Sequence, residues 1–320
     1  MHQPLEMRNL SDYNQNPRTM ANKQDLDFTY TTIDKIFLIA MGEIADYSGA
    51  MYNGDFSMTL REAQRKKHEF IADSLNIKKG SKVLDMGCGW GPVTNYVTKE
   101  RGAECIGLTL SEGQAKACQK HGLNVMVKDC RFVKPHEFGT FDAISSVGAF
   151  EHFCSVEEYK AGKQEEIYRS IFDHVYDLLP VGGRFYLQTM VFGKNMLDYE
   201  DFDINADKSS TPYMLALMEK EFPGSWLPYG DEMVIRNTEP KFKLISKSSG
   251  RLDYIETLNQ FQKNMRKFQW KKYLLYLSLL PRTLYDEKFR HMLAVLRYSP
   301  NQVCFKREVM DHFRFVFEKV

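Results

Sequence analysis

The sequence lacks the features that mark secreted, membrane-spanning and polyanion-binding proteins. Its six cysteines include no Cys-x-x-Cys pair, which argues against a zinc site and fits reduced thiols in a cytosolic protein. No apolar run approaches the ~20 residues that span a bilayer, and no basic-then-apolar leader opens the chain. The formal net charge of +1 gives little bulk attraction for nucleic acid. We therefore expect a soluble cytoplasmic protein with no metal site and no nucleic-acid partner.

The chain does contain enough apolar sequence for a substantial core. Its 320 residues are 43% hydrophobic and 27% charged, which fits one large domain. Residues 1–27 are polar and lack apolar periodicity, so we expect a loosely ordered tail before a single domain over residues 28–320. Residues 198–242 interrupt the later pattern with a polar segment and a Pro-Gly turn. We expect them to form a helical insertion that covers the substrate.

Between these segments, short apolar stretches alternate with amphipathic ones. The apolar stretches predict strands over residues 82–86, 104–108, 124–128, 141–147 and 183–189. The amphipathic stretches predict helices over residues 60–75, 93–100, 111–121, 165–179 and 213–222. Such alternation requires crossover connections, so it predicts an α/β fold with a doubly wound, mostly parallel sheet and helices on both faces.

Residues 82–91, Lys-Val-Leu-Asp-Met-Gly-Cys-Gly-Trp-Gly, predict a buried strand that runs into a glycine turn and then a helix. Such a corner binds nucleotides because glycine lets the backbone approach a ligand closely. Gly87, Gly89 and Gly91 form G-x-G-x-G and lack the third glycine of the dinucleotide fingerprint. An acidic residue before the first glycine, here Asp85, is the pattern of S-adenosylmethionine methyltransferases. The turn therefore favours a methyltransferase over a nicotinamide enzyme.

Two further loops follow predicted strands. The first contains Ser111-x-x-Gln114, a capping-box pattern in which the two side chains satisfy free amides at the start of a helix. The second contains Gly148, Glu151 and His152 after the fourth strand. Because ligands of doubly wound sheets bind beyond the carboxyl ends of the strands, we expect the chemistry in this second loop. A surface carboxylate at position 151 and an outward-facing ring at position 152 are the alternatives.

Three motifs in this order resemble the cyclopropane-fatty-acid synthase and mycolic-acid methyltransferase family. The motifs are residues 83–91, 107–114 and 146–153. The similarity continues through residues 178–183 and 254–258 and covers roughly residue 47 to the C-terminus. The resemblance implies a class I methyltransferase fold that uses S-adenosylmethionine, often on an unsaturated acyl chain.

The resemblance also implies which residues contact the cofactor. The family uses the Thr and Gln of the loop that contains Ser111-x-x-Gln114, and a Tyr-Ser pair near the start of the domain, beside the cofactor. Methyltransferases commonly place an acidic residue near adenine after the third strand, although Cys130 replaces the aromatic residue that often follows it. The expected cofactor-binding residues are Tyr47, Ser48, Asp85, Gly87, Gly89, Thr109, Leu110, Gln114, Asp129 and Gly148.

The family's anion site is only partly present. In relatives, Cys, Glu, His and Tyr side chains hold a bicarbonate that acts as the base. Glu151 and Tyr254 match this set, but Gly49 stands in the Cys position and Gln188 in the His position. Because Gln can donate a hydrogen bond but cannot carry a proton charge, these departures weigh against bicarbonate. The expected catalytic residues are Glu151, His152, Tyr254 and Gln188.

Several acceptors remain open at this point. In the first alternative, the product is a methylated or cyclopropanated lipid. In the second, water captures the carbocation that methyl transfer to an alkene leaves. In the third, the acceptor is an amine, as in plant alkaloid N-methyltransferases that resemble this family. A lipid- or cofactor-binding protein without catalysis is a further alternative. Aromatic residues over 261–276 predict either a hydrophobic tunnel or helix core, and the cations among them either a contact with anionic headgroups or a solvated face. We expect a hydrophobic small molecule or an acyl chain as substrate, with peripheral membrane contact.

Overall fold

The computed structural model describes residues 45–221, 225–286 and 300–320. Their strands form one seven-stranded sheet in the order β3-β2-β1-β4-β5-β7-β6. Strands β1 to β5 pair in parallel, and β7 runs antiparallel between β5 and β6. The strands are β1 Lys82–Met86, β2 Glu104–Thr109, β3 Val125–Val127, β4 Ala143–Val147, β5 Arg184–Phe192, β6 Phe242–Ser249 and β7 Met310–Lys319.

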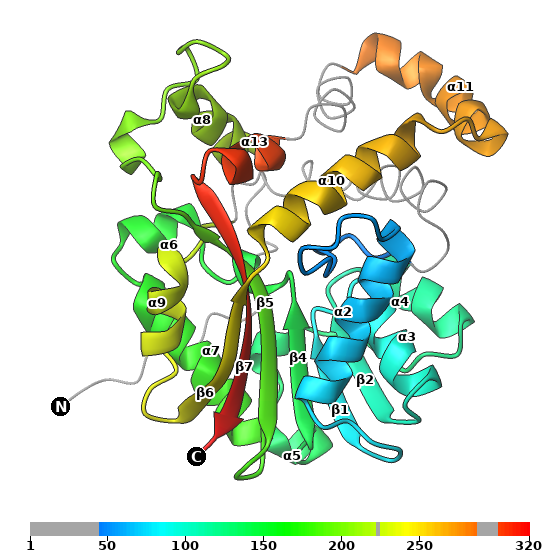
Figure 1. The fold of residues 1–320 in the computed structure, drawn as a ribbon, viewed down its shortest axis with the longest axis vertical. Coiled ribbons are helices and arrows are strands. Elements are labelled where there is room, and N and C mark those ends of the chain that lie inside the picture. Colours follow the sequence, from blue (N-terminus) through cyan, green and yellow to red (C-terminus); the bar gives the residue numbers. More distant parts are fainter. Residues whose placement is uncertain (1–44, 222–224, 287–299) are drawn as a thin grey trace.

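Helices cover both faces of this sheet (Figure 1). The longer helices are α2 Leu60–Ser74, α3 Pro92–Lys99, α4 Glu112–Lys120, α7 Gln164–Leu178, α8 Thr211–Glu221, α10 Arg251–Arg266 and α11 Trp270–Tyr285. The shorter ones are η2 Cys130–Phe132, α5 Pro135–Phe138, η3 Phe150–His152, α6 Val156–Lys160, η4 Tyr199–Asp201, α9 Gly230–Arg236 and α13 Pro300–Lys306. No helix within the described ranges is both long enough and apolar enough to cross a bilayer.

Alternate side chains of the central strand enter different cores, because successive residues of a strand point to opposite faces. Val83 shares a buried cluster with Ile71 of α2 and Val97 of α3. Its neighbour Leu84 shares the larger cluster with Phe172 of α7. The parallel strands point toward α8, α10 and α13, which lie above their carboxyl ends (Figure 1). These helices therefore enclose the edge of the sheet where ligands of such folds bind.

The predicted fold class is confirmed, and all five predicted strands are present. The main difference is at β5, which continues to Phe192 instead of ending at Thr189. The extension follows from its antiparallel partner, because β7 pairs with β5 from Arg184 to Phe192. The sequence pattern identified neither this pairing nor β6. The predicted tail, residues 1–27, lies outside the described residues.

Candidate active site

Two glycines shape the turn after β1. Gly87 and Gly89 have φ angles of +80° and +55°, in the left-handed region that favours glycine. A Cβ at Gly87 would lie 2.3 Å from the Cβ of Ala149, so the turn packs tightly against the loop after β4. A Cβ at Gly89 would meet no atom within 4 Å. Gly87 is therefore required by packing, and Gly89 leaves its backbone open to a ligand.

Asp85 ties this turn to its neighbours. Its carboxylate is 2% exposed and accepts hydrogen bonds from Thr94 Oγ1 at 2.9 Å and Ser145 Oγ at 3.0 Å. Burial raises the pKa of this carboxyl group to about 6, although both hydrogen bonds oppose the shift. Because Thr94 lies on α3 and Ser145 on β4, Asp85 fixes the turn between these two elements and also borders the cavity described below.

The loop after β2 is held by its own side chains. Ser111 caps α4 by accepting a hydrogen bond from Gln114 N at 3.3 Å. The reciprocal bond of the predicted capping box is absent, because the Gln114 side chain instead accepts a hydrogen bond from Thr109 Oγ1 at 2.7 Å. Gln114 lines the cavity, Thr109 is buried, and Leu110 is 72% exposed. Only half of the predicted capping box is therefore present.

The predicted adenine contact, Asp129, has local partners. Its carboxylate caps η2 by accepting from Arg131 N at 3.0 Å and pairs with Arg131 Nη2 at 2.6 Å. Asp129 is not among the described residues that line the cavity. Its cofactor contact stays a prediction.

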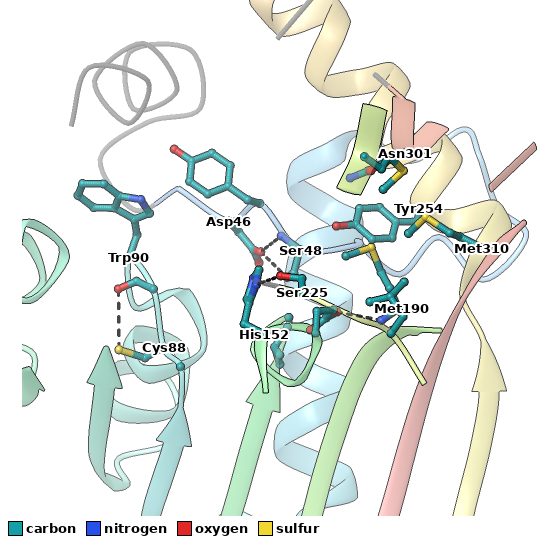
Figure 2. A pocket seen from close by; sticks show the side chains of 18 of the residues that line it. Asp46, Ser48, Cys88, Trp90, His152, Met190, Ser225, Tyr254, Asn301 and Met310 are labelled. Atoms are coloured by element: carbon teal, nitrogen blue, oxygen red, sulfur yellow. Dashed lines mark hydrogen bonds between the residues drawn. The ribbon is translucent and has the colours of Figure 1, made fainter. Parts of the chain in front are cut away.

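A cavity of about 460 Å³ lies at the carboxyl ends of the parallel strands. Figure 2 shows Cys88 and Trp90 on one side of it and Met190, Tyr254, Asn301 and Met310 on the other. We call the first side the glycine end, formed by Asp85, Gly87, Cys88, Gly89 and Trp90. We call the second side the methionine end, formed by Met190, Tyr254, Asn301 and Met310. The cavity therefore joins a backbone-rich end to an end with mostly apolar side chains.

Glu151 projects from η3 and borders the cavity. The side chain is 2% exposed, and its Oε1 accepts a hydrogen bond from Met190 N at 2.8 Å. Its Oε2 is buried and has no hydrogen-bond partner among the described residues. Burial raises the pKa of this carboxyl group to about 7. Such a group exchanges a proton readily near neutral pH, which suits a general base.

His152 and Tyr254 also line the cavity. His152 Nδ1 lies 2.7 Å from Ser225 Oγ, and partial burial lowers the pKa of its imidazole, which favours the neutral ring (Figure 2). The Tyr254 ring packs 4.9 Å from the rings of Phe305 and His312, measured between centroids. Burial raises the pKa of its hydroxyl, so Tyr254 stays a hydrogen-bond donor at neutral pH.

Gln188 is held by neighbouring groups, and its predicted catalytic role stays a prediction. Its side chain is 1% exposed, donates to Gly49 O at 2.9 Å and accepts from Tyr186 OH at 2.8 Å. It is not among the described residues that line the cavity. The structure thus brings Glu151, His152 and Tyr254 to one cavity and places Gln188 behind the loop that contains Gly49.

A buried ion cluster supports that loop and was missed by sequence reasoning. Lys67 of α2 is fully buried, and its Nζ lies 2.6 Å from both Asp46 Oδ2 and Ser48 Oγ. His68 Nε2 lies 2.8 Å from the same Asp46 oxygen. Burial opposes ionisation of Asp46, yet the Lys67 ammonium and His68 hold the pKa of its carboxyl group well below the usual range. Asp46, Tyr47 and Ser48 all line the cavity, so the cluster positions part of its wall.

A signal for this cluster was present in the sequence. Gln64, Lys67 and Ile71 are spaced as one face of a helix, and all three are buried. A lysine on the apolar face of an amphipathic helix requires a buried anion as partner. The sequence offers no signal for Asn301 of α13, whose buried Oδ1 faces the cavity without a hydrogen-bond partner among the described residues.

This fold, with a cavity beside the glycine turn, is that of class I S-adenosylmethionine-dependent methyltransferases. The chain belongs to the mycolic acid cyclopropane synthetase family, whose model matches residues 18–294. It is 26% identical over 294 residues to cyclopropane mycolic acid synthase 3 of Mycobacterium tuberculosis, covering 91% of this chain and 95% of the relative. It is 30% identical over 235 residues to cyclopropane mycolic acid synthase 2 of Mycobacterium bovis, covering 72% and 76%.

A solved structure agrees with this assignment. The crystal structure of the mycolic acid cyclopropane synthase CmaA1, complexed with SAH and CTAB, superposes with a TM-score of 0.69. It is 24% identical in sequence and covers 91% of this chain and 95% of that one, so the two chains share a fold. The family predicted from three motifs is confirmed, and with it the enzyme class and the cofactor S-adenosylmethionine. The open backbone at Gly89 and the buried Asp85 fit that cofactor.

Proposed function

We propose that the enzyme transfers a methyl or methylene group from S-adenosylmethionine to an unsaturated acyl chain or a similar hydrophobic acceptor. One observation carries the proposal: a single cavity joins the glycine end to the largely apolar methionine end, with buried Glu151 on its wall. The names of the relatives, which are mycolic acid synthases, favour a lipid acceptor over an amine or a role in binding alone.

S-adenosylmethionine supplies a methyl group activated by its sulfonium. The enzyme's task is to hold the acceptor double bond in line with that methyl group, since near-contact positioning drives the transfer. When an alkene carbon takes the methyl group, the bond from sulfur to that methyl group would break, S-adenosylhomocysteine would leave with the electron pair, and positive charge would develop on the adjacent carbon of the acceptor. Glu151 Oε2, which has no other partner in the described structure, then accepts the proton whose loss closes a ring or forms an alkene.

The cofactor is proposed to lie at the glycine end. Tyr47, Ser48, Gln114 and Gly148 line the cavity together with Asp85, Gly87 and Gly89, which supports their predicted roles. The contacts predicted for Thr109, Leu110 and Asp129 remain proposals without support from the cavity lining.

We propose that Glu151, and not bicarbonate, is the base. Gly49 supplies no side chain, and a Cβ there would lie 3.1 Å from His312 Cε1 and 3.2 Å from Tyr254 Cγ. Gln188 uses both ends of its amide on other groups. Two of the four expected ligand positions therefore hold no group directed at an anion.

Residues 198–242 are proposed to form the cover over the acceptor. They run from η4 through α8 and α9 and end where β6 begins. Their contribution to the cavity supports this role and consists of Phe202, Leu215, Met218, Glu219, Ser225, Trp226 and Leu227. Most of these side chains are apolar, as an acyl chain requires. We also propose a cytoplasmic location, supported by six buried cysteines that form no disulfide.

Mass spectrometry tests the proposed acceptor. A lipid extract incubated with the enzyme and isotopically labelled S-adenosylmethionine should gain one labelled CH₂ unit on unsaturated acyl chains. The Glu151→Gln variant is the control for enzyme-dependent transfer. Label that enters only amines, or no lipid at all, would contradict the proposal.

A further inference from the structure

The helix α11 presents an open apolar face at the far end of α10 from the sheet (Figure 1). Trp270 and Leu277 are 61% and 65% exposed, and Phe268 just before the helix is 78% exposed. Trp270, Leu274 and Leu277 are four and three residues apart, which places them on one face of the helix. Leu274 and Leu280 are exposed as well. Single exposed leucines are ordinary, but a continuous stripe is typical of a binding surface.

The other side of α11 is covered. Leu279 is buried and packs with Leu275, Tyr276 and, at the end of α10, Met265. This small cluster anchors α11 and leaves the stripe facing away from it. The stripe is therefore a surface of a packed helix and does not belong to the core of the sheet.

The sequence of this segment is rich in basic residues. Residues 257–285 contain six Lys or Arg and no Asp or Glu, whereas the whole chain is nearly balanced at +1. Lys271 Nζ lies 5.8 Å from the centroid of the Trp270 ring, so a cation accompanies the exposed aromatic side chain. The six cations of the segment are Lys263, Arg266, Lys267, Lys271, Lys272 and Arg282.

Exposed leucines, aromatic side chains and a run of basic residues in one segment match an anionic lipid surface. Leucines enter the boundary between headgroups and acyl chains, Trp and Tyr favour the interface, and each Lys or Arg is attracted to anionic lipids. An acidic protein would also attract the cations, but a polar acidic face would leave the leucine stripe in water. The combination therefore favours a membrane over an acidic protein.

We propose that α11 docks the enzyme on anionic phospholipid bilayers. The purpose of this docking rests on the proposed function, because acyl chains are found in membranes. The geometry links the two sites: α10 contributes Tyr254 from its first turn to the methionine end and leads to α11. Binding itself requires neither the cofactor nor turnover, so the two proposals are tested separately.

Vesicle flotation without S-adenosylmethionine tests the surface. The full chain should bind vesicles of phosphatidylglycerol and phosphatidylcholine and should bind phosphatidylcholine alone much more weakly. Trp270→Ser/Leu277→Ser and Lys267→Glu/Lys271→Glu should each weaken binding to the anionic vesicles by ~10-fold or more. The matched control is Val181→Ser, which changes an exposed apolar residue in the turn before β5, 77% exposed and at the amino end of the strand. Its binding should equal that of the wild type.

Four results would overturn the surface proposal. The first is no binding to anionic vesicles, and the second is full binding by both α11 variants. The third is a wild-type dimer in sedimentation that Trp270→Ser/Leu277→Ser converts to a monomer, because a second copy would then cover the stripe. Capture of an acidic carrier protein in place of vesicles would have the same meaning. Vesicle binding without methylation of detergent-solubilised lipid would instead reject the proposed acceptor and leave the surface standing.

Discussion

The glycine end of the cavity comes from one continuous stretch of sequence, whereas the methionine end comes from separate elements. Asp85, Gly87 and Gly89 lie within five residues on β1 and its turn. Met190, Tyr254 and Asn301 come from β5, α10 and α13. The residues of the glycine end determine their own turn geometry. The side chains of the methionine end come from different elements, so each can be substituted without changing the others. The geometry of the glycine end is therefore set by local sequence, whereas that of the methionine end depends on packing between distant segments.

The largest expected effect is at the glycine end. Gly89→Val should abolish S-adenosylmethionine binding, because its side chain fills the open space and valine disfavours a φ of +55°. Gly162→Val is the matched control, since Gly162 has a φ of +70° and open space but does not line the cavity. Calorimetry should show binding in the control only. Unchanged affinity in a folded Gly89→Val variant would remove the site from this turn.

A change at Glu151 should lower turnover and leave cofactor binding intact. Glu151→Gln should lower turnover ~100- to 10,000-fold with nearly unchanged cofactor affinity, because the amide cannot accept the proton. Glu157→Gln, at an exposed position near the start of α6, is the control and should behave as the wild type. Wild-type turnover in Glu151→Gln would make this carboxylate a structural residue.

A third change tests the loop that forms part of the wall. Lys67→Met should destabilise the fold by about 3 to 5 kcal/mol, because it leaves the buried Asp46 carboxylate without its ammonium partner. Lys116→Met removes an exposed pair with Glu112 and should leave the denaturation midpoint unchanged. Equal midpoints for the two variants in urea would show that the buried cluster does not support the loop.

The pH dependence of turnover should separate Glu151 from Asp85. Burial raises the pKa of Glu151 to about 7, and a base must be deprotonated, so turnover should fall as the pH drops below about 7. If turnover depended on the charge of Asp85, whose pKa is raised to about 6, the decline would instead lie near pH 6. The decline near pH 7 should disappear in the residual activity of Glu151→Gln. Persistence of that decline would assign it to another group.

The sequence predicted the parts that depend on local pattern. The five parallel strands, the glycine turn and the loop with Glu151 and His152 all lie in continuous motifs whose geometry their own residues determine. The cofactor's identity came from resemblance to a family and not from periodicity. The alternation also could not assign β6 and β7, because antiparallel pairing at the sheet edge depends on which strands meet.

The residues that sequence reasoning missed, and the contacts of Gln188, depend on packing between distant segments. Asp46 and Lys67 meet only because α2 packs beside the loop before it, and Asn301 reaches the cavity from α13. Gln188 was expected at the reacting centre from its place in a motif. Its amide is instead held by Tyr186 OH and by the carbonyl of Gly49, a contact that spans 139 residues of sequence.

The most direct test of the central claim is labelled methyl transfer to lipid in buffer freed of carbonate. The claim is that Glu151, beside the methionine end, serves as the base without bicarbonate, since Gly49 and Gln188 provide no ligands for it. Turnover should be the same with and without added bicarbonate, and Glu151→Gln should show the same ~100- to 10,000-fold loss in both. Turnover that collapses without carbonate and returns when bicarbonate is added would contradict the claim.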